Sequence, residues 1–405
     1  MIDAMPLPGV VIVGAARTAI GRYGGTLRAT HAAELGACAA RAAIARAAIS
    51  PEDLDEIIMG QARQAGSGPN PARQAGSRAG IPHTVPAQTL NQACASGLQA
   101  VAVGAQAIQT GQASIVLAGG MESMSRMPYL IDSEDARWGH RMGDFTLVDA
   151  MYRDGFACPL SNLLMGETAE VLARQYGITR DASDAYAAES QRRATAAIVA
   201  GRFADEIVAA PGRDAKGQPV DLDRDEHPRA GVTVEGLAKL PLVFDGVEGQ
   251  PGIITAGSAS GITDGGAAVV LTSRKEADRR GLPALARIIG WATAGVDPRV
   301  MGIGPVPAIR KLLERTGLTL EDFDLVELNE AFAPQVLAVL ADVPIPADRL
   351  NVNGGAIALG HPIGATGTRI LVTLLYEMMR RGSRRGLATL CVSGGLGMAL
   401  AIERV

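Results

Sequence analysis

The sequence predicts an α/β protein built from two similar halves, and three observations lead to this fold class. Short apolar strands alternate with Ala-rich or amphipathic helical stretches along both halves of the 405-residue chain. Glycine-rich corners follow several of these strands, where they let the backbone turn tightly and approach a ligand. Blocks of similar character also recur at a long and nearly constant offset, which indicates a duplicated domain rather than a solenoid.

The repeat is carried by three pairs of segments that occur in the same order in each half. They are 49–55 with 318–324, 94–97 with 364–367, and 115–120 with 390–395. We therefore expect an N-terminal domain over 1–126, completed by about 251–277, and a C-terminal domain over 278–405. The intervening residues 127–250 differ in character, with a helical stretch from Thr168 to Ala200 between loops rich in Asp, Arg, Pro and Gly. We interpret them as an inserted lid or loop domain.

Composition narrows the class of protein. Hydrophobic residues make up 47% and charged residues 20%, as in a globular chain. The formal charge of −4 and the lack of a basic tract argue against nucleic acid as a partner. No apolar run approaches the roughly 20 residues that a membrane helix needs. Residues 1–14 resemble a lead into the first strand rather than a signal peptide, so a cytoplasmic location is expected.

Four widely spaced cysteines, none in a C-x-x-C pair, predict free thiols without a metal site: Cys38, Cys94, Cys158 and Cys391. Cys94 follows a short strand and precedes a long helix-compatible run. At a helix N-terminus the macrodipole and unpaired N–H groups favour a thiolate and can hold an oxyanion. This predicts a nucleophile, with a buried packing cysteine as the open alternative.

Three further segments carry chemistry. His361 lies in a glycine-dense loop before a helix, and its repeat partner is the Cys94 loop. Pseudo-twofold packing would place a base beside the thiol, although a structural role for His361 stays open. Cys391 ends an apolar strand, where its thiol could move a proton or only pack. Asn329 and Glu330 end another strand, as ligand-binding polar residues do in open α/β sheets.

The chain resembles the thiolase family along essentially its whole length. The motifs are Asn91-Gln92-x-Cys94-x-Ser96-Gly97, Gly119-Gly120-Met121-Glu122-Ser123-Met124-Ser125, Asn329-Glu330-Ala331-Phe332-Ala333, Asn353-Gly354-Gly355-Ala356-Ile357-Ala358-x-Gly360-His361-Pro362-x-Gly364 and the Cys391 strand end. The resemblance implies a five-layer α-β-α-β-α arrangement of duplicated domains with an inserted lid. It also implies a homodimer or homotetramer that acts on acyl-CoA in fatty acid metabolism.

The resemblance also implies the roles of the site residues. Cys94 takes the acyl group as a thioester, and His361 removes the thiol proton. Asn329 holds a water that forms one oxyanion hole with His361, and the backbone N–H groups of Cys94 and Ser393 form the second. Cys391 takes the α-proton of the second acyl-CoA.

For coenzyme A, the resemblance points to Arg229, Ala256, Ser260, Met165, Phe244 and Phe332, with Met301 beside the acyl tunnel. Coenzyme A thioesters are expected as substrates, with no permanently bound cofactor and no metal. One departure concerns Leu164, which stands where acetoacetyl-CoA enzymes of the family tend to have His. The apolar residue predicts tolerance of longer acyl groups.

Two other readings remain to be weighed. A ketoacyl synthase-like condensing enzyme would pair its Cys with two His, or with His and Asn, and lack a second cysteine, so Cys391 argues against it. A thiolase-like carrier that binds acyl-CoA or lipid without turnover would have lost its nucleophile or base, and both are present here.

Overall fold

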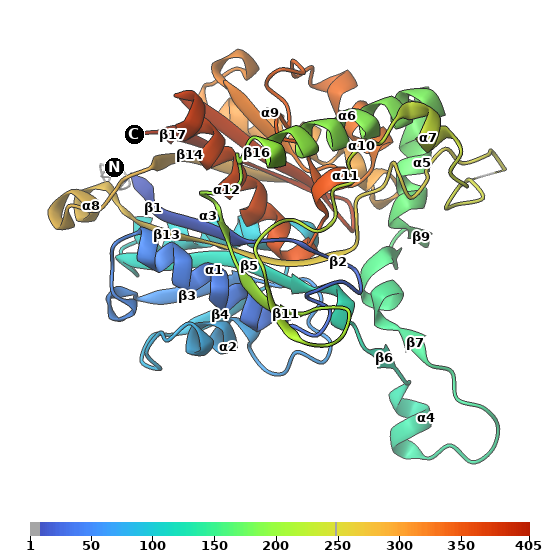
Figure 1. Cartoon of the computed structure of the whole chain (residues 1–405), viewed down its shortest axis with the longest axis horizontal. Coiled ribbons are helices and arrows are strands. Elements are labelled where there is room, and N and C mark those ends of the chain that lie inside the picture. The colour runs from blue at the N-terminus through green and yellow to red at the C-terminus, as the bar shows by residue number, and fades with distance from the viewer. Residues whose placement is uncertain (1–8, 248) are drawn as a thin grey trace, which may run out of the picture.

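The chain forms two layered β-sheets related by the internal repeat (Figure 1). A computed structural model describes residues 9–247 and 249–405, so most of the predicted N-terminal lead, residues 1–8, lies outside the described part. In the first half the strand order is β1 (Val10–Thr18), β13 (Thr263–Ser273), β5 (Ile115–Ser123), β3 (Glu56–Gly60) and β4 (Ala87–Leu90). In the second half it is β14 (Ala286–Gly295), β17 (Leu396–Arg404), β16 (Arg385–Val392) and β15 (Leu325–Leu328).

The pairing directions repeat between the halves. Each sheet begins with two antiparallel pairs, β1–β13 with β13–β5 and β14–β17 with β17–β16, and continues with a parallel pair, β3–β5 or β15–β16. The sheets join where Val11 and Ile12 of β1 pair with β14. A complete repeat would give the second half a fifth strand that corresponds to β4. In the second half, Leu350 forms only a single parallel bridge to Val326, at the place where β4 pairs with β3.

Helices complete a five-layer arrangement, as predicted. Helices α1 (Ala32–Arg46) and α2 (Pro71–Arg78) cover the outer face of the first sheet, and α9 (Pro305–Thr316) and α10 (Ala333–Asp342) cover that of the second. Helices α3 (Ser96–Gln109) and α12 (Ile363–Arg381) lie between the sheets (Figure 1). Their apolar side chains pack together with strands of both halves in one buried cluster, which fixes the central layer.

The repeated blocks at 49–55 and 318–324 fold alike. Each contains a short 3₁₀ turn, η1 (Pro51–Asp53) or η6 (Leu320–Asp322), that leads into β3 or β15. In each, the third residue of the turn, Asp53 or Asp322, accepts the backbone N–H of the capping Ser50 or Thr319 at 2.9 Å. The same local signal therefore starts the same strand in both halves.

The segment between β5 and β13 is only partly helical. The stretch expected over 168–200 is two helices, α5 (Met165–Gln175) and α6 (Arg180–Val199). It breaks at Gly177, whose φ of 62° is left-handed, and restarts where Thr179 caps α6. The remaining elements are β2 (Gly21–Arg22), η2 (Ala93–Ala95), η3 (Met124–Arg126), β6 (Tyr129–Leu130), α4 (Ser133–Trp138), β7 (Val148–Asp149), η4 (Tyr152–Phe156), β8 (Ala157–Cys158), β9 (Leu163–Leu164), β10 (Ile207–Val208), β11 (Ala210–Arg213), β12 (Pro219–Leu222), α7 (Val234–Ala238), α8 (Arg274–Arg280), η5 (Pro298–Ile303) and α11 (Ala356–Leu359).

A buried ion cluster fastens this segment to the first sheet. Arg17 on β1 is fully buried and donates to Glu206 at 2.6 Å and to both carboxylate oxygens of Asp225 at 2.7 and 2.9 Å. Because each charge is desolvated, loss of one partner would leave the others uncompensated. By contrast, β6, α4 and β7 project away from the body of the molecule (Figure 1).

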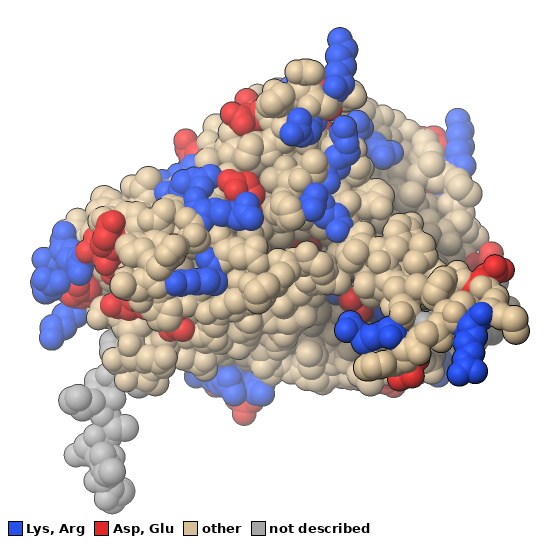
Figure 2. All heavy atoms as spheres, turned by 90° about the horizontal axis from the view of Figure 1, so that it is seen from below, with Lys and Arg blue, Asp and Glu red and all other residues tan. Residues whose placement is uncertain are grey.

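The surface carries charges of both signs. On the face shown in Figure 2, Lys and Arg side chains stand among Asp and Glu side chains rather than forming one continuous basic area. Within the described ranges, no helix is both long enough and apolar enough to cross a membrane.

Glycines bring the two central helices into backbone contact. A Cβ on Gly367 of α12 would lie 2.5 Å from the backbone N of Leu98 on α3. A Cβ on Gly97 would lie 2.9 Å from the carbonyl oxygen of Gly364. Any side chain at these positions would push α3 and α12 apart.

The first prediction concerns this contact. Gly367→Ala should lower the free energy of unfolding, because overpacking costs about 1–3 kcal/mol and exceeds the helix-propensity gain of about 1 kcal/mol. Denaturant unfolding measures the change. Gly9→Ala is the control, since a Cβ there meets nothing within 4 Å. An unchanged midpoint for Gly367→Ala would show that the helices can separate without cost.

Candidate active site

Cys94 stands in a tight turn between β4 and α3. The turn is held by Ser96, whose hydroxyl accepts the N–H of Gln92 at 2.9 Å and donates to the carbonyl of Ala93 at 2.6 Å. Ala93 has a φ of 44°, in the left-handed region that an alanine rarely adopts. Such strain persists only where its surroundings enforce it, and it often marks a functional position. Here it immediately precedes the thiol.

The environment of Cys94 differs from the expectation that a helix terminus makes it a thiolate. Burial raises the pKa of the Cys94 thiol, and this effect exceeds the opposing influence of the Ser393 N–H and the Arg63 charge. Near neutral pH Cys94 is therefore a thiol. Its use as a nucleophile requires a base.

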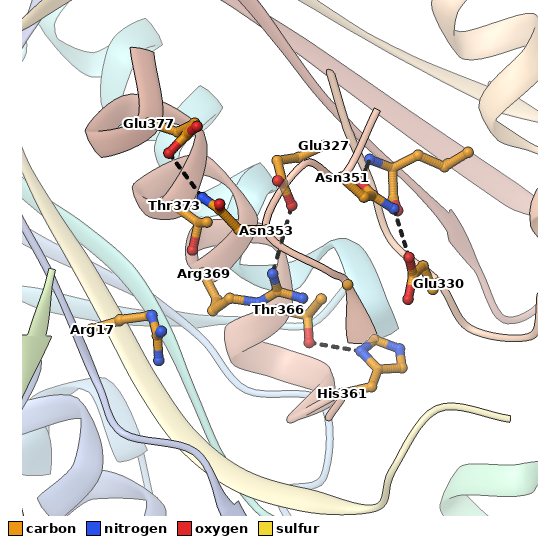
Figure 3. Close-up of polar contacts among 12 residues, drawn as sticks. Arg17, Glu327, Glu330, Asn351, Asn353, His361, Thr366, Arg369, Thr373 and Glu377 are labelled. Atoms are coloured by element: carbon orange, nitrogen blue, oxygen red, sulfur yellow. Dashed lines mark hydrogen bonds and ion pairs between the residues drawn. The ribbon is translucent and has the colours of Figure 1, made fainter. Parts of the chain in front are cut away.

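His361 is that candidate base, and its position follows from the loop before α12. Its Nδ1 lies 2.6 Å from the hydroxyl oxygen of Thr366, one turn into the helix (Figure 3). The Thr366 hydroxyl also donates to the carbonyl of Pro362 at 3.0 Å. Since that bond uses its only proton, Thr366 accepts from His361, which places the imidazole proton on Nδ1 and leaves Nε2 as a lone pair.

Electrostatics keep this imidazole neutral. Burial, together with the nearby positive charges of Arg369 and Arg63, lowers the pKa of His361 to about 3. Arg369 is fully enclosed on α12 and forms its ion pair with Glu327 at 3.7 Å (Figure 3). At neutral pH His361 is therefore an unprotonated base.

Glu330 organises the loop that carries His361. We expected this acid to satisfy backbone or His groups. Its carboxylate accepts the Ile357 N–H at 3.1 Å and bonds three side chains at 2.6 to 3.0 Å, those of Tyr186, Ser190 and Asn351. Figure 3 shows the contact with Asn351. Glu330 thus ties the loop to α6 and does not itself contact His361.

Asn329 and Cys391 lie at the ends of two neighbouring strands of the second sheet, β15 and β16. The Nδ2 atom of Asn329 lies 3.5 Å from Nε2 of His361, and its Oδ1 is buried with no protein partner in the described chain. Cys391 is buried against Met165 and Met301. Burial and the neighbouring Cys94 raise the pKa of the Cys391 thiol above its ordinary value. The Cys94 and Cys391 thiols therefore lie close enough to interact electrostatically.

A mainly apolar cavity of 220 Å³ opens beside His361. Four residues assigned to coenzyme A by resemblance line it: Met165, Phe244, Ser260 and Phe332. Leu164, the departure from the acetoacetyl-CoA pattern, lines it too. The other two residues, Arg229 and Ala256, are exposed and are not part of its lining.

A second cavity of 540 Å³ lies on the other side of Met165, which lines both. Its wall includes Ala93 and Ser393, which flank the reactive thiols in sequence, together with Arg63 and Cys158. Sequence reasoning missed Arg63, because a single Arg after a strand has no distinguishing pattern. In the described ranges, no three His, Cys, Asp or Glu side chains are grouped as metal ligands.

Comparisons with known proteins agree with this architecture. The family description "Thiolase, N-terminal domain" matches residues 10–275, and "Thiolase, C-terminal domain" matches residues 282–404. The chain is 53% identical to an acetyl-CoA acetyltransferase of Pseudomonas aeruginosa, over 98% of this chain and 99% of the relative. It is 50% identical to one of Rhizobium meliloti, over 99% and 100% of the respective chains.

Solved structures give the same result. A crystal structure of the Bacillus anthracis acetyl-CoA acetyltransferase matches with a TM-score of 0.94 and 44% identity, covering 98% of this chain and 99% of that one. Human mitochondrial 3-ketoacyl-CoA thiolase in complex with CoA matches with a TM-score of 0.92 and 43% identity, covering 98% of both chains. Fold and comparisons define an acyltransferase of the layered α/β class. Within that class, the chain belongs to the thiolase family.

The second prediction concerns Thr366. Thr366→Val should lower kcat about 10- to 100-fold, the value of one hydrogen bond to a group that becomes charged. Nitrogen NMR of the His361 ring should also show loss of the single Nδ1–H tautomer. The control is Thr368→Val on the same helix, because the buried Thr368 hydroxyl has no partner among the described residues. Equal kcat values for the two variants would contradict the role of Thr366.

Proposed function

We propose that the protein is a thiolase that works through an acyl-enzyme on Cys94, with His361 as base and Cys391 as the second proton carrier. The observation that supports the proposal is the contact between η2, which carries Cys94, and α12, whose preceding loop carries His361. The backbone N–H of Ser393 lowers the pKa of Cys94, and Cys94 raises the pKa of Cys391.

The steps follow from the geometry. In cleavage of a 3-ketoacyl-CoA, Nε2 of His361 takes the Cys94 proton and the sulfur attacks the keto carbon. The C2–C3 bond breaks, the acyl group stays on Cys94 as a thioester, and Cys391 gives its proton to the acetyl-CoA carbanion. The Cys391 thiolate then takes the thiol proton of coenzyme A, whose sulfur attacks the thioester and takes the acyl group. The departing Cys94 sulfur recovers its proton from His361, which restores both thiols and the neutral imidazole. Condensation is the reverse, in which Cys391 takes the α-proton.

Hydrogen-bond donors for the negative charges that develop during the reaction are proposed near Cys94 and His361. The backbone N–H groups of Cys94 and Ser393 both lower the pKa of the Cys94 thiol, and we assign them as donors to the tetrahedral oxyanion that would form there. The unpartnered Oδ1 of Asn329 can hold a water beside Nε2 of His361. Together these would form the two oxyanion holes that the family resemblance implies.

Coenzyme A is proposed to enter through the 220 Å³ cavity, with Met165, Phe244, Ser260 and Phe332 along the pantetheine. Arg229 and Ala256 lie outside this lining and are assigned to the nucleotide part. The CoA complex of the human thiolase supports this class of ligand. No permanent cofactor is proposed.

The domain division is proposed as above: 1–126 with 251–277, the inserted 127–250, and 278–405. The placement of β13 in the first sheet supports it. A cytoplasmic homodimer or homotetramer that acts in fatty acid metabolism is also proposed. The projecting segment exposes apolar side chains, among them Trp138 and Met142, as a subunit contact would require.

The third prediction tests the nucleophile. Cys94→Ser should abolish turnover, because an alcohol does not ionise as a thiol does. Incubation of the wild type with acetyl-CoA should add one acetyl group, located on Cys94 by mass spectrometry. Cys38→Ser, which changes a buried thiol on α1, is the control and should retain labelling. Acetylation of another residue would contradict the assignment of Cys94 as the nucleophile.

The fourth prediction separates the two thiols. Cys391→Ala should still accept acetyl on Cys94 but should lose about 10²- to 10⁴-fold in condensation, the usual value of a proton-transfer residue. Deuterium exchange at the acetyl methyl group of acetyl-CoA reports proton removal alone. Wild type should exchange and the variant should not. Normal exchange in Cys391→Ala would leave Cys391 with a packing role only.

A further inference from the structure

The 540 Å³ cavity contains a buried cation that the proposed reaction does not use. Arg63 follows β3 and is only 6% exposed. Its guanidinium makes one hydrogen bond within the described chain, from Nη2 to the carbonyl of Gly155 at 3.0 Å, and its Nε is buried without a partner. A buried guanidinium normally satisfies most of its five donors, so this one requires an explanation.

No acid of the described chain neutralises Arg63 through an ion pair. The nearest candidate is Glu122 on β5, and its carboxylate oxygens accept backbone N–H groups of Ala62, Arg63 and Gly364 at 2.9 to 3.2 Å. At the cavity mouth, Arg153 and Asp154 are exposed and of opposite sign. The Arg63 guanidinium therefore borders the cavity without a carboxylate in direct contact, although its charge still acts on Glu122 and lowers the pKa of that acid.

The backbone around Arg63 is built to hold the guanidinium still. The two N–H bonds to Glu122 fix the chain at Ala62 and Arg63, and Gly155 lies against the side chain from the inserted segment. A Cβ on Gly155 would be 3.0 Å from the Nε of Arg63. The glycine allows a close backbone approach on one side, while the other side borders the cavity.

The cavity also borders residues that lie next to the reacting thiols in the sequence. Ala93 and Ser393 form part of its wall, and the Arg63 charge acts on both Cys94 and His361. Met165 separates it from the cavity assigned to coenzyme A. Two cavities therefore lie near the Cys94 turn, one of them mainly apolar and the other lined by a buried cation.

We propose that the second cavity receives the far end of the acyl group and that this end carries a carboxylate, held by Arg63. The substrate class is then a 3-ketoacyl-CoA with a terminal carboxylate, and the acyl-enzyme is an ω-carboxyacyl thioester. A planar carboxylate matches the guanidinium fork and would satisfy its free N–H groups. This inference rests on the proposed function, in which Cys94 carries the acyl group.

The experiment compares kcat/KM for two 3-ketoacyl-CoA esters of equal length, one ending in a carboxylate and one in a methyl group. Wild type should favour the carboxylate ester. Arg63→Leu should lower the carboxylate-to-methyl ratio about 10- to 100-fold. Arg63→Lys should give an intermediate ratio, because it keeps the charge but loses the fork. The control Arg274→Leu removes an exposed arginine on α8 and should leave the ratio unchanged.

A wild-type preference for the methyl ester, or an Arg63→Leu ratio equal to that of wild type, would overturn the proposal. Should Arg63→Leu fail to fold, the wild-type and Arg63→Lys ratios decide. Mass spectrometry after incubation with succinyl-CoA or butyryl-CoA separates this inference from the proposed function. Labelling of Cys94 by neither ester contradicts the acyl-enzyme itself. Labelling by butyryl-CoA alone contradicts only the carboxylate site.

Discussion

The backbone contact between α3 and α12 is the constraint on which the rest of the structure depends. Gly97 and Gly367 bring the N-terminal ends of the two helices together, and each helix end carries a loop from a different half of the chain. Cys94 precedes one helix and His361 precedes the other. Main-chain packing, rather than the length of the side chains, therefore brings the loops of Cys94 and His361 together. A duplicated fold with larger residues at this contact would keep its sheets but separate the thiol from its base.

Burial then sets the ionisation of the groups that meet there. It raises the pKa values of Cys94 and Cys391 and lowers that of His361, so thiol, thiol and imidazole are all uncharged in the resting enzyme. Burial also raises the pKa of Glu122 to about 7. A proton moved from sulfur to imidazole creates charge where solvent is scarce, which makes fixed N–H donors especially effective.

Much of this arrangement could be predicted from the sequence, because periodicity and repeat spacing depend on local residues. The capping of Ser50 and Thr319 recurs in both halves as the repeat predicts, whereas the five-layer arrangement was expected from the family resemblance. The break at Gly177 was missed, since one glycine in a helical pattern is often tolerated. The left-handed Ala93 and the unpaired Arg63 were missed for another reason. Both features depend on contacts with residues that are distant in the sequence, and neither an alanine nor an arginine is distinctive enough to predict them.

The position of β13 has a consequence for how the protein is made. The strand lies between β1 and β5 in the sheet, yet it follows β5 by the whole inserted segment. A ribosome adding about 5–20 residues per second would leave that edge of β5 unpaired for roughly 7–30 s and that edge of β1 for roughly 12–50 s. Open edges of apolar strands recruit other chains, so the nascent N-terminal half is exposed to aggregation during that interval. In the second half, β17 follows β16 directly, so that this central pair can form as soon as it emerges.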